Sequence, residues 1–284
     1  MKARWGLFLI PPFLVTFVLM TASQYVFLKG SFFRDLGLGR VGDTLELANY
    51  IKFFSDSFYL KTLWLTIEVS GLATLFTLIL GYPVAYTIAR MRSRFAMVML
   101  AAVVISTFIT IVIKVFGLII IFAADGWLNQ SLMALGIIDQ PFTILGKESG
   151  VVVGLMHFSL GFGVLLLYSV VQTIPRSYEE AARVHGASRL RTFWRVVFPL
   201  SLPGVTIGGL MIFNMCMGAF TSAALLGGGR VFTLPVLIQR TVIMETKYSM
   251  GGALAAILVV SVLLINLLSV VLFKRMKATR HMTV

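Results

Sequence analysis

The sequence is short of charge, and of acidic residues most of all. Only 12% of its 284 residues are charged, and 11 Asp and Glu stand against 24 Lys and Arg. Soluble domains carry roughly 25% charged residues. Because 58% of the residues are hydrophobic and lie in long runs, the composition excludes an ordinary soluble domain and indicates a bilayer around most of the chain.

Reactive and metal-binding groups are scarce as well. Cys216 is the only cysteine and lies in an apolar run, which excludes a disulfide within one chain. We interpret it as a small buried residue, because a nucleophile needs a positioned base and a lowered pKa. The three histidines are scattered, at positions 157, 185 and 281, so no metal-ligand cluster supports a membrane enzyme.

A phosphate-binding loop is also missing from the sequence. No G-x-x-x-x-G-K-[ST] pattern occurs, and the glycine run 227–229, followed by Arg230, lacks the Lys-Ser/Thr ending. The chain therefore does not hold a nucleoside triphosphate by that mechanism. Any ATP hydrolysis linked to this protein belongs to separate chains.

The hydrophobic residues form six segments long enough to cross a bilayer, which takes about 20 residues. They predict an all-α membrane protein with a single domain over 1–284. The first segment follows Lys2 and Arg4, as a signal peptide would, but it is too long for a signal core and is interpreted as a retained span. The predicted spans are 6–28, 61–89, 96–123, 150–172, 203–226 and 250–273.

The positive charges predict the orientation of these spans. With the N-terminus inside, the inner segments hold 14 cations against Glu179 and Glu180, whereas the outer loops hold nine cations and eight acids. Both termini are therefore expected in the cytoplasm. The excess of Lys and Arg over Asp and Glu is thus explained by membrane topology, and no nucleic-acid partner is needed to explain it. The inner cations are Lys2, Arg4, Arg90, Arg92, Arg94, Arg176, Arg183, Arg189, Arg191, Arg195, Lys274, Arg275, Lys277 and Arg280.

The outer loops give weaker signals. In the first of them, Leu47, Tyr50, Ile51 and Phe54 have helical spacing, which predicts a short helix on the outer surface. Asp125-Gly126 and the glycines at 227–229 predict loops over 124–149 and 227–249.

The segment 175–202, between spans four and five, has the strongest local signals. Ser177 and Glu180 have the spacing of a capping box, which predicts a helix from Ser177 to a C-terminal cap at Gly186. A second helix is predicted from Ser188, with one apolar stripe formed by Leu190, Phe193, Trp194 and Val197. Pro199 should end this helix and Pro203 should open the next span.

The first of these helices is about nine residues long, too short to be stable alone in water. A short capped helix with small residues suits a groove on another protein. The alternative is an ordinary amphipathic linker between two spans.

The same segment resembles the cytoplasmic signature of binding-protein-dependent ABC import permeases. That signature is Glu-Ala-Ala, three residues, Gly, nine residues, an aliphatic residue, one residue, an apolar residue and Pro. The chain matches it with Glu180, Ala181, Ala182, Gly186, Val196, Phe198 and Pro199, where Phe198 replaces the usual Leu. Within these permeases the chain is similar to the spermidine/putrescine branch, first-permease type, through 136–141 and 218–228 as well.

The resemblance implies a transport subunit rather than an enzyme. It implies a coupling helix that docks on an ATPase, with Glu179, Glu180, Ala181, Ala182, Arg183, His185 and Gly186 as coupling residues. The implied partners are two copies of the ATPase, which would bind ATP and magnesium, a second and similar permease chain, and a periplasmic binding protein. The implied location is a bacterial inner membrane, in contact with lipid.

Three ionisable residues fall inside the spans, where charge is costly and often functional. Glu68, Lys114 and His157 are predicted at similar depth, roughly 10–14 Å below the outer surface at about 1.5 Å per residue. One interpretation is that they line or gate the solute path. The alternatives are an ion pair between Glu68 and Lys114, and a hydrogen-bonded packing role for His157.

Span five contributes three further candidates. Asn214 lies near its middle, where transporters often bind solute, and Phe220 and Thr221 follow about two turns later. A helix–helix hydrogen bond by Asn214 and plain packing of Phe220 are the alternatives. Gly204 and Gly208 are interpreted as packing residues.

The cargo is expected to be a small polar solute such as a polyamine, an opine or an amino-acid-like compound. A polyamine site should offer several carboxylates and aromatic faces, but the spans hold one acid and one Lys, which disfavours a simple polyamine assignment. A secondary transporter driven by an ion gradient is the main rival. It would favour broken spans and inverted repeats, neither of which is clear in the sequence. A structural subunit without a path is a further alternative.

Overall fold

The computed structural model describes the backbone of residues 5–37 and 39–281, and the side chains of 9–36 and 39–271. Lys2 and Arg4, and the side chains of Lys274, Arg275, Lys277 and Arg280, lie outside the described residues. The chain divides into two compact units. The terminal unit is Met1–Leu63 with Leu234–Val284, and the central unit is Trp64–Thr233.

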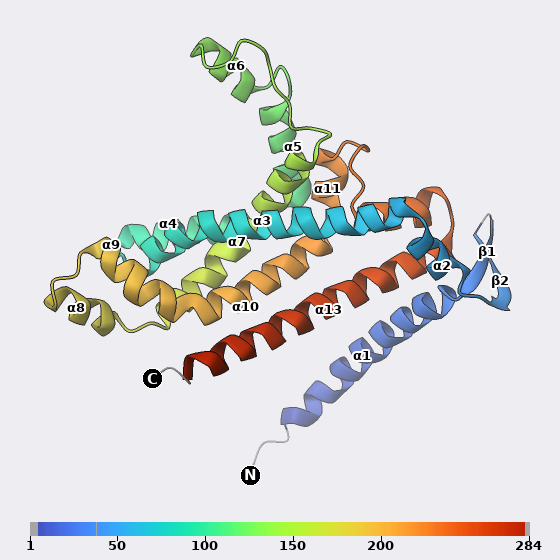
Figure 1. The fold of residues 1–284 in the computed structure, drawn as a ribbon, viewed down its shortest axis with the longest axis horizontal. Coiled ribbons are helices and arrows are strands. Elements are labelled where there is room, and N and C mark those ends of the chain that lie inside the picture. Colours follow the sequence, from blue (N-terminus) through green and yellow to red (C-terminus); the bar gives the residue numbers. More distant parts are fainter. Residues whose placement is uncertain (1–4, 38, 282–284) are drawn as a thin grey trace. The chain divides into compact units, whose positions relative to one another are not determined.

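The terminal unit consists of two long helices joined to short elements. Helices α1 and α13 lie side by side in opposite directions, so the start of α1 and the end of α13 lie at the same end of this unit (Figure 1). A β-hairpin and α2 occupy the other end. The elements are α1 (Trp5–Gly30), β1 (Phe33–Gly37), β2 (Arg40–Leu45), α2 (Ala48–Ser55), α12 (Leu234–Gln239), the π-helix η2 (Arg240–Met244) and α13 (Tyr248–His281).

The central unit is a helical bundle that contains most of α3 (Ser57–Arg90). Helices α8 and α9 lie at one end of it, and α5, α6 and α11 at the opposite end (Figure 1). Its other elements are α4 (Arg94–Phe108), α5 (Ile111–Phe122), α6 (Trp127–Ala134), α7 (Glu148–Gln172), α8 (Arg176–Val184), α9 (Arg189–Thr192), the π-helix η1 (Phe193–Val197), α10 (Phe198–Met217) and α11 (Thr221–Leu226).

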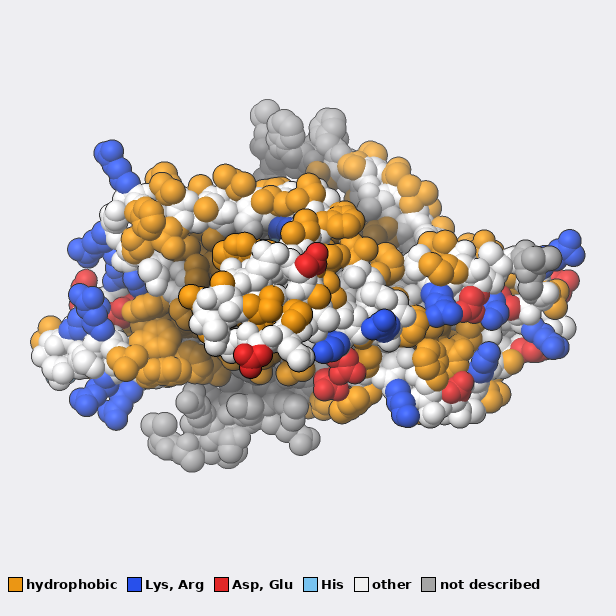
Figure 2. All heavy atoms as spheres, turned by 90° about the horizontal axis from the view of Figure 1, so that it is seen from above, with side chains coloured by type: hydrophobic (Ala, Val, Ile, Leu, Met, Phe, Trp, Pro, Cys, Tyr) orange, Lys and Arg blue, Asp and Glu red, His pale blue; other side chains and the backbone are white. Residues whose placement is uncertain are grey.

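Six helical segments of the described chain are long and apolar enough to cross a membrane. The largely helical fold with six candidate spans is confirmed, although the β-hairpin at 33–45 departs from a purely α-helical protein. Many large hydrophobic side chains remain exposed on these helices, such as Phe13, Trp64 and Leu263, each more than half exposed. Figure 2 shows how much of the surface is hydrophobic, as expected where lipid replaces water.

The third and fifth spans are broken, which corrects the continuous segments 96–123 and 203–226. The first break, at 109–110, separates α4 from α5 at the start of five β-branched residues, 109–113, which disfavour helix. The second follows Gly218, which disfavours helix by its backbone freedom. The candidate membrane span in this region is Ile111–Ala134, which begins after the first break and combines α5 with α6.

The expected break between Pro199 and Pro203 is also wrong, because α9, η1 and α10 form one continuous helix from Arg189 to Met217. Pro199 has no N–H to donate. The π-turn before it widens the helix, and the Phe198 N–H bonds to the Phe193 carbonyl five residues back. The wider turn shifts the hydrogen-bond pattern by one residue just before Pro199, and the helix continues past the proline without a break.

The predictions for the loops between the spans can also be compared with the structure. Helix α2 confirms the short helix predicted around 47–54. The loops expected over 124–149 and 227–249 instead contain α6, α12 and η2. Positive φ at Gly228 and Gly229 confirms a turn there.

Close packing in the central unit depends on small residues of facing helices. A Cβ on Gly204 would lie 2.6 Å from Val170, and one on Gly208 would lie 2.2 Å from Leu166. These glycines therefore let α10 approach α7, which confirms their packing role. Hydroxyl groups tie α3 to the same helices, through Thr77 to Ser159 at 2.7 Å and Tyr82 to Ser201 at 2.6 Å.

Gly126, between α5 and α6, gives a test of this structure. Its Cβ would meet the carbonyl oxygens of Ile120 and Ile121 at 2.5 and 2.6 Å. Backbone atoms cannot move aside as a side chain can, so Gly126→Ala should destabilise the protein by about 1–3 kcal/mol. Thermal unfolding of the purified protein in detergent measures the effect. Gly117→Ala is the control, since nothing lies within 4 Å of its Cβ, and equal unfolding temperatures for the two variants would contradict the structure.

Candidate functional site

The first candidate site is the junction of α8 with the end of α3. Helix α8 is preceded by Pro175, whose side chain cannot accept a capping hydrogen bond, and the helix begins at Arg176. Ser177 therefore lies inside the helix, and the predicted capping box from Ser177 to Glu180 is wrong. Gly186 has φ +80°. The Ala187 N–H bonds to the Ala182 carbonyl, which is the glycine-dependent helix end that was predicted.

Glu179 anchors α8 to α3. Its Oε1 lies 2.5 Å from Arg90 Nε, and the two side chains are only 6% and 14% exposed. Neither of these atoms makes an aligned hydrogen bond, so the contact is an ion pair. The Tyr86 hydroxyl donates to the other oxygen, Oε2, at 3.1 Å. Glu179 therefore faces the bundle and is not presented to solvent.

Two arginines lock the ends of α3 and α7 to each other. Arg90 Nη2 donates to the Ile174 carbonyl, just past the end of α7, and Arg176 Nη2 donates to the Ala89 carbonyl at the end of α3, each at 3.1 Å. The last carbonyls of a helix lack partners within it, and cations are favourable there. Arg90 thus binds both a helix end and the Glu179 carboxylate.

An aromatic cluster supports the other side of this junction. The ring of Phe193, in the π-turn, lies 5.5 Å from Tyr82, 5.2 Å from Tyr86 and 5.1 Å from Trp194. These edge-on contacts hold the start of the continuous α9–α10 helix against α3. Val197 is fully buried, but Leu190 and Trp194 are 69% and 54% exposed, so the predicted stripe is only partly buried within this chain.

Beside the junction lies a groove of about 740 Å³ with several basic side chains on its walls. Figure 2 shows further basic side chains gathered around the end formed by α8 and α9. The lining residues are Pro83, Tyr86, Thr87, Arg90, Met91, Arg183, Arg189, Leu190, Phe193 and Trp194.

The remaining residues proposed for coupling lie on the outer side of α8. Glu180 forms only a long contact of 4.0 Å with Arg92, and both side chains are mostly exposed. Ala181, Arg183 and His185 are exposed, and Ala182 is half-buried. This face also carries two large apolar side chains, Tyr178 at 54% and Val184 at 85% exposed.

The second candidate site lies where the two broken spans resume. Helices α5 and α11 pack on each other and on α7. Lys114 lies in the first turn of α5, and His157 is near the middle of α7; both are half-buried.

The residues expected from span five flank the second break. Asn214 lies in the last turn of α10 and is half-buried, while Phe220 precedes α11 and is 36% exposed. Thr221 is the first residue of α11. These three residues therefore border non-helical backbone, which a membrane tolerates only inside protein or beside a water-filled cavity.

Glu68 is exposed on α3. Among the described side chains, no ion pair joins Glu68 to Lys114: the described ion pairs involve only Glu179, Glu180 and Glu245 as acids. Ion pairs among the described residues therefore do not neutralise the charge of Glu68 or that of Lys114.

Sequence reasoning missed the Arg90–Glu179 pair and the Tyr86 hydroxyl. In the sequence, Arg90 enters only the prediction of topology, and Glu179 enters the predictions of topology and of coupling. The two residues lie 89 positions apart, and no local pattern links them. The one available signal was that both lie beside span ends on the same predicted face of the membrane.

The pattern of the family described as "Binding-protein-dependent transport system inner membrane component" matches residues 77–278. The chain belongs to this family. As such an inner membrane component, it is a permease subunit of an ABC importer and not an enzyme.

Individual relatives of this permease agree with that assignment. It is 30% identical to the spermidine/putrescine transport system permease protein PotB of Haemophilus influenzae, over 85% of this chain and 84% of the relative. It is 30% identical to the molybdenum transport system permease protein ModB of Azotobacter vinelandii, over 60% of this chain and 73% of the relative.

A solved structure shares the fold of this permease. It is that of a bacterial ABC transporter involved in the import of the acidic polysaccharide alginate, with a TM-score of 0.79 and 18% identity. The match covers 95% of this chain and 96% of that chain. The broken spans, which would have favoured a secondary transporter, therefore occur here in a permease of the ABC type.

The buried ion pair yields a stability prediction. Glu179→Gln leaves Arg90 as an uncompensated buried charge and should cost about 3–5 kcal/mol of unfolding free energy. Glu180→Gln removes only the exposed contact with Arg92 and should change stability by less than about 0.5 kcal/mol. Chemical unfolding in detergent compares the two. Equal effects of the two substitutions would show that Glu179 does not anchor α8.

Proposed function

We propose that the permease is driven through α8, which acts as the coupling helix for cytoplasmic ATPase subunits. The proposal is carried by one observation: α8 is fixed to α3 by buried Glu179 on one face and exposes Tyr178 and Val184 on the other. A helix of nine residues held in this way presents an apolar ridge suited to a groove on a partner. The match of 180–199 to the permease signature supports the same role.

The proposed orientation follows from the charge distribution. The arginines around α8 and α9 would lie in the cytoplasm together with both termini, in accord with the positive-inside rule. The β-hairpin and α2 would then face the outside. Two ATPase copies would bind ATP and magnesium, a second permease chain would complete the path, and a periplasmic protein would deliver the solute.

Val184 tests the coupling proposal. Val184→Asp places a charge on the most exposed apolar side chain of α8 and should weaken ATPase binding by about 2 kcal/mol, roughly 30-fold. Co-purification of the ATPase and ATP-dependent uptake by proteoliposomes should both fall. The thermal unfolding of the permease itself should not change.

Leu36→Asp is the matched control for the co-purification measurement. Leu36 is also an exposed apolar residue, at 63%, but it lies in the β-hairpin. Its substitution should leave ATPase co-purification intact. If Val184→Asp and Leu36→Asp retain the ATPase equally, α8 does not couple the two subunits.

We propose further that the solute path passes Lys114 and Glu68 and that the solute carries charges of both signs. Neither side chain forms an ion pair with the other, and a charge in a span is costly without a partner. Lys114 also lies at the positive end of α5, where the helix dipole favours an anion. A fully cationic polyamine would be repelled at this point, whereas an amino-acid-like solute offers each residue a partner.

Uptake of solutes from different charge classes tests this path. Lys114→Met should reduce uptake of a zwitterionic amino acid by about tenfold or more, since a lost charged hydrogen bond is worth about 1.5–3 kcal/mol. The same substitution should not lower the rate of putrescine uptake. Lys61→Met, which removes an exposed lysine near the start of α3, is the control. Unchanged amino-acid uptake by Lys114→Met would remove Lys114 from the path.

A further inference from the structure

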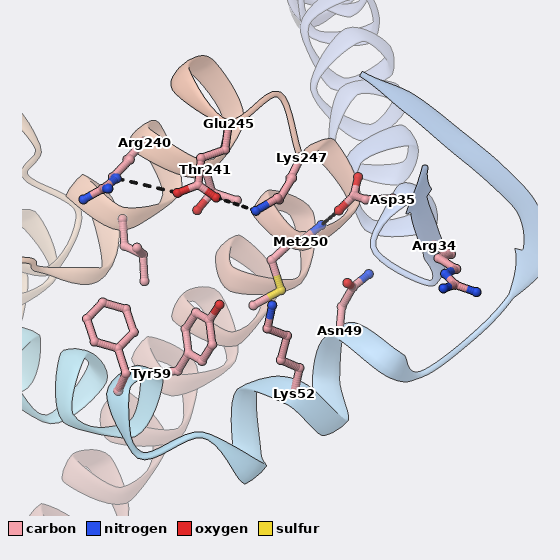
Figure 3. A pocket seen from close by; sticks show the side chains of 12 residues that line it. Arg34, Asp35, Asn49, Lys52, Tyr59, Arg240, Thr241, Glu245, Lys247 and Met250 are labelled. Carbon is pink, nitrogen blue, oxygen red and sulfur yellow. Dashed lines mark hydrogen bonds and ion pairs between the residues drawn. The ribbon is translucent and has the colours of Figure 1, made fainter. Parts of the chain in front are cut away.

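A second charged pocket lies in the terminal unit, away from the sites described above. It is a cavity of about 380 Å³ between β1, α2 and the turn that joins η2 to α13 (Figure 3). Its walls carry four cations and two acids. The lining residues are Arg34, Asp35, Asn49, Lys52, Phe58, Tyr59, Leu237, Arg240, Thr241, Glu245, Lys247 and Met250.

Both acids of this pocket are already bound within the chain. Asp35 accepts the backbone N–H groups of Ser249 at 3.0 Å and Met250 at 2.9 Å, which caps the start of α13. Glu245 lies 2.8 Å from Lys247 Nζ and 3.6 Å from Arg240 Nε. Figure 3 shows these contacts along one wall of the pocket.

The contact between Glu245 and Lys247 keeps both of these groups ionised. The hydrogen bond from Lys247 lowers the pKa of the Glu245 carboxyl, and the same bond raises the pKa of the Lys247 ammonium. Both groups therefore remain charged and paired at neutral pH. Neither acid is left over to bind an external cation.

Two cations of the pocket form no ion-pair contact, although Lys52 is the weakest of the charges that lower the pKa of the Glu245 carboxyl. Arg34 and Lys52 are exposed, and neither belongs to an ion pair among the described residues. Lys52 rises from α2 toward Met250, into the pocket (Figure 3). The unsatisfied charge of the pocket is thus positive, which favours an anion and disfavours a polyamine.

The turn that forms one wall is strained. Thr246 has φ +52° and is the one residue other than glycine with positive φ in the described part of the chain. A β-branched residue rarely adopts this conformation unless its surroundings hold it there. The strained turn places Glu245 and Lys247 side by side and so preserves the form of the pocket.

The surroundings of the pocket suit a protein better than a small ion. Leu36, Ile51 and Phe54 are each 63% exposed near it, on β1 and α2. Exposed apolar side chains beside polar ones mark contact surfaces for a protein or a membrane, and a small ion would not use them. In the proposed orientation this end faces the outside, where the binding protein docks.

We infer that this pocket receives a carboxylate side chain, Asp or Glu, of the periplasmic binding protein, with Arg34 and Lys52 as its contacts. The inference rests on the proposed function, because it requires the hairpin end to face outward. Arg34 offers a planar fork and Lys52 a mobile ammonium, and both suit a carboxylate. The contact would fix the orientation of the docked protein and raise its rate of association.

Affinity measurements on the assembled transporter in lipid nanodiscs test this site. Lys52→Met and Arg34→Gln should each weaken binding of the purified binding protein about two- to fivefold, as expected for exposed ion pairs. Lys52→Glu should weaken it more than either, and the loss of affinity with added salt should become shallower. Lys61→Met and Arg94→Gln remove exposed cations outside the pocket and outside the hairpin and should leave the affinity unchanged.

Two outcomes would overturn the inference. One is equal binding by the pocket variants and the controls. The other is that citrate binds to the transporter alone through Lys52 and Arg34, while the affinity for the binding protein does not depend on these residues. That result would assign the pocket to small anions.

Uptake separates this inference from the proposed function. Lys52→Met should keep ATP-dependent uptake at saturating binding protein. If wild-type uptake required no ATP, the proposed function itself would fail, whatever the pocket variants did. If uptake requires ATP but all variants bind equally, only the pocket assignment fails.

Discussion

The contact between Arg90 and Glu179 is the interaction on which the cytoplasmic half of the proposed mechanism depends. Two opposite charges are withdrawn from water at the end of a span, and each can stay ionised there because the other is present. The pair joins a helix of nine residues, which has little stability of its own, to a helix of 34 residues. Tyr86 and the carbonyl of Ile174 complete the partners of the two groups. A short segment thus acquires the rigidity of the bundle.

The broken spans impose the complementary constraint at the other end of the central unit. Backbone groups released at 109–110 and around 218–220 need partners that lipid does not provide. Helices α5, α7 and α11 meet there, and Lys114, His157 and Thr221 belong to them. Irregular backbone and unpaired charge thus occur in the same part of the bundle, and both are costly in lipid. Their coincidence is easier to explain by a polar path than by packing alone.

Much of this fold could be predicted from hydrophobic runs, because the bilayer makes length and composition decisive. Those rules locate six spans but not their interruptions, since 109–113 and 218–220 remain hydrophobic and pass any hydropathy criterion. Pro199 misled for a related reason: a rule for α-helices does not foresee the π-turn that accommodates a proline. The helix 176–184 was found through its glycine end and family signature. Its anchoring by Arg90 could not be found, because charge pairs between distant segments depend on tertiary packing. The β-hairpin was missed because its glycine-rich sequence lacks a clear alternation of apolar residues.

The unbroken helix from Arg189 to Met217 has a mechanical consequence. Its 29 residues correspond to a rod of about 43 Å, held near one end by an aromatic cluster and ending beside the second break. A tilt of about 5° around the held end would move the far end by about 4 Å, on the scale of a water molecule's diameter, over this length. In the proposed orientation, a small rotation at the cytoplasmic end of this helix would become a displacement of a few ångströms beside the second break. The π-turn is what keeps the helix continuous through Pro199. The segment can therefore move as one rigid body, whereas a hinge at the proline would let its two parts move separately.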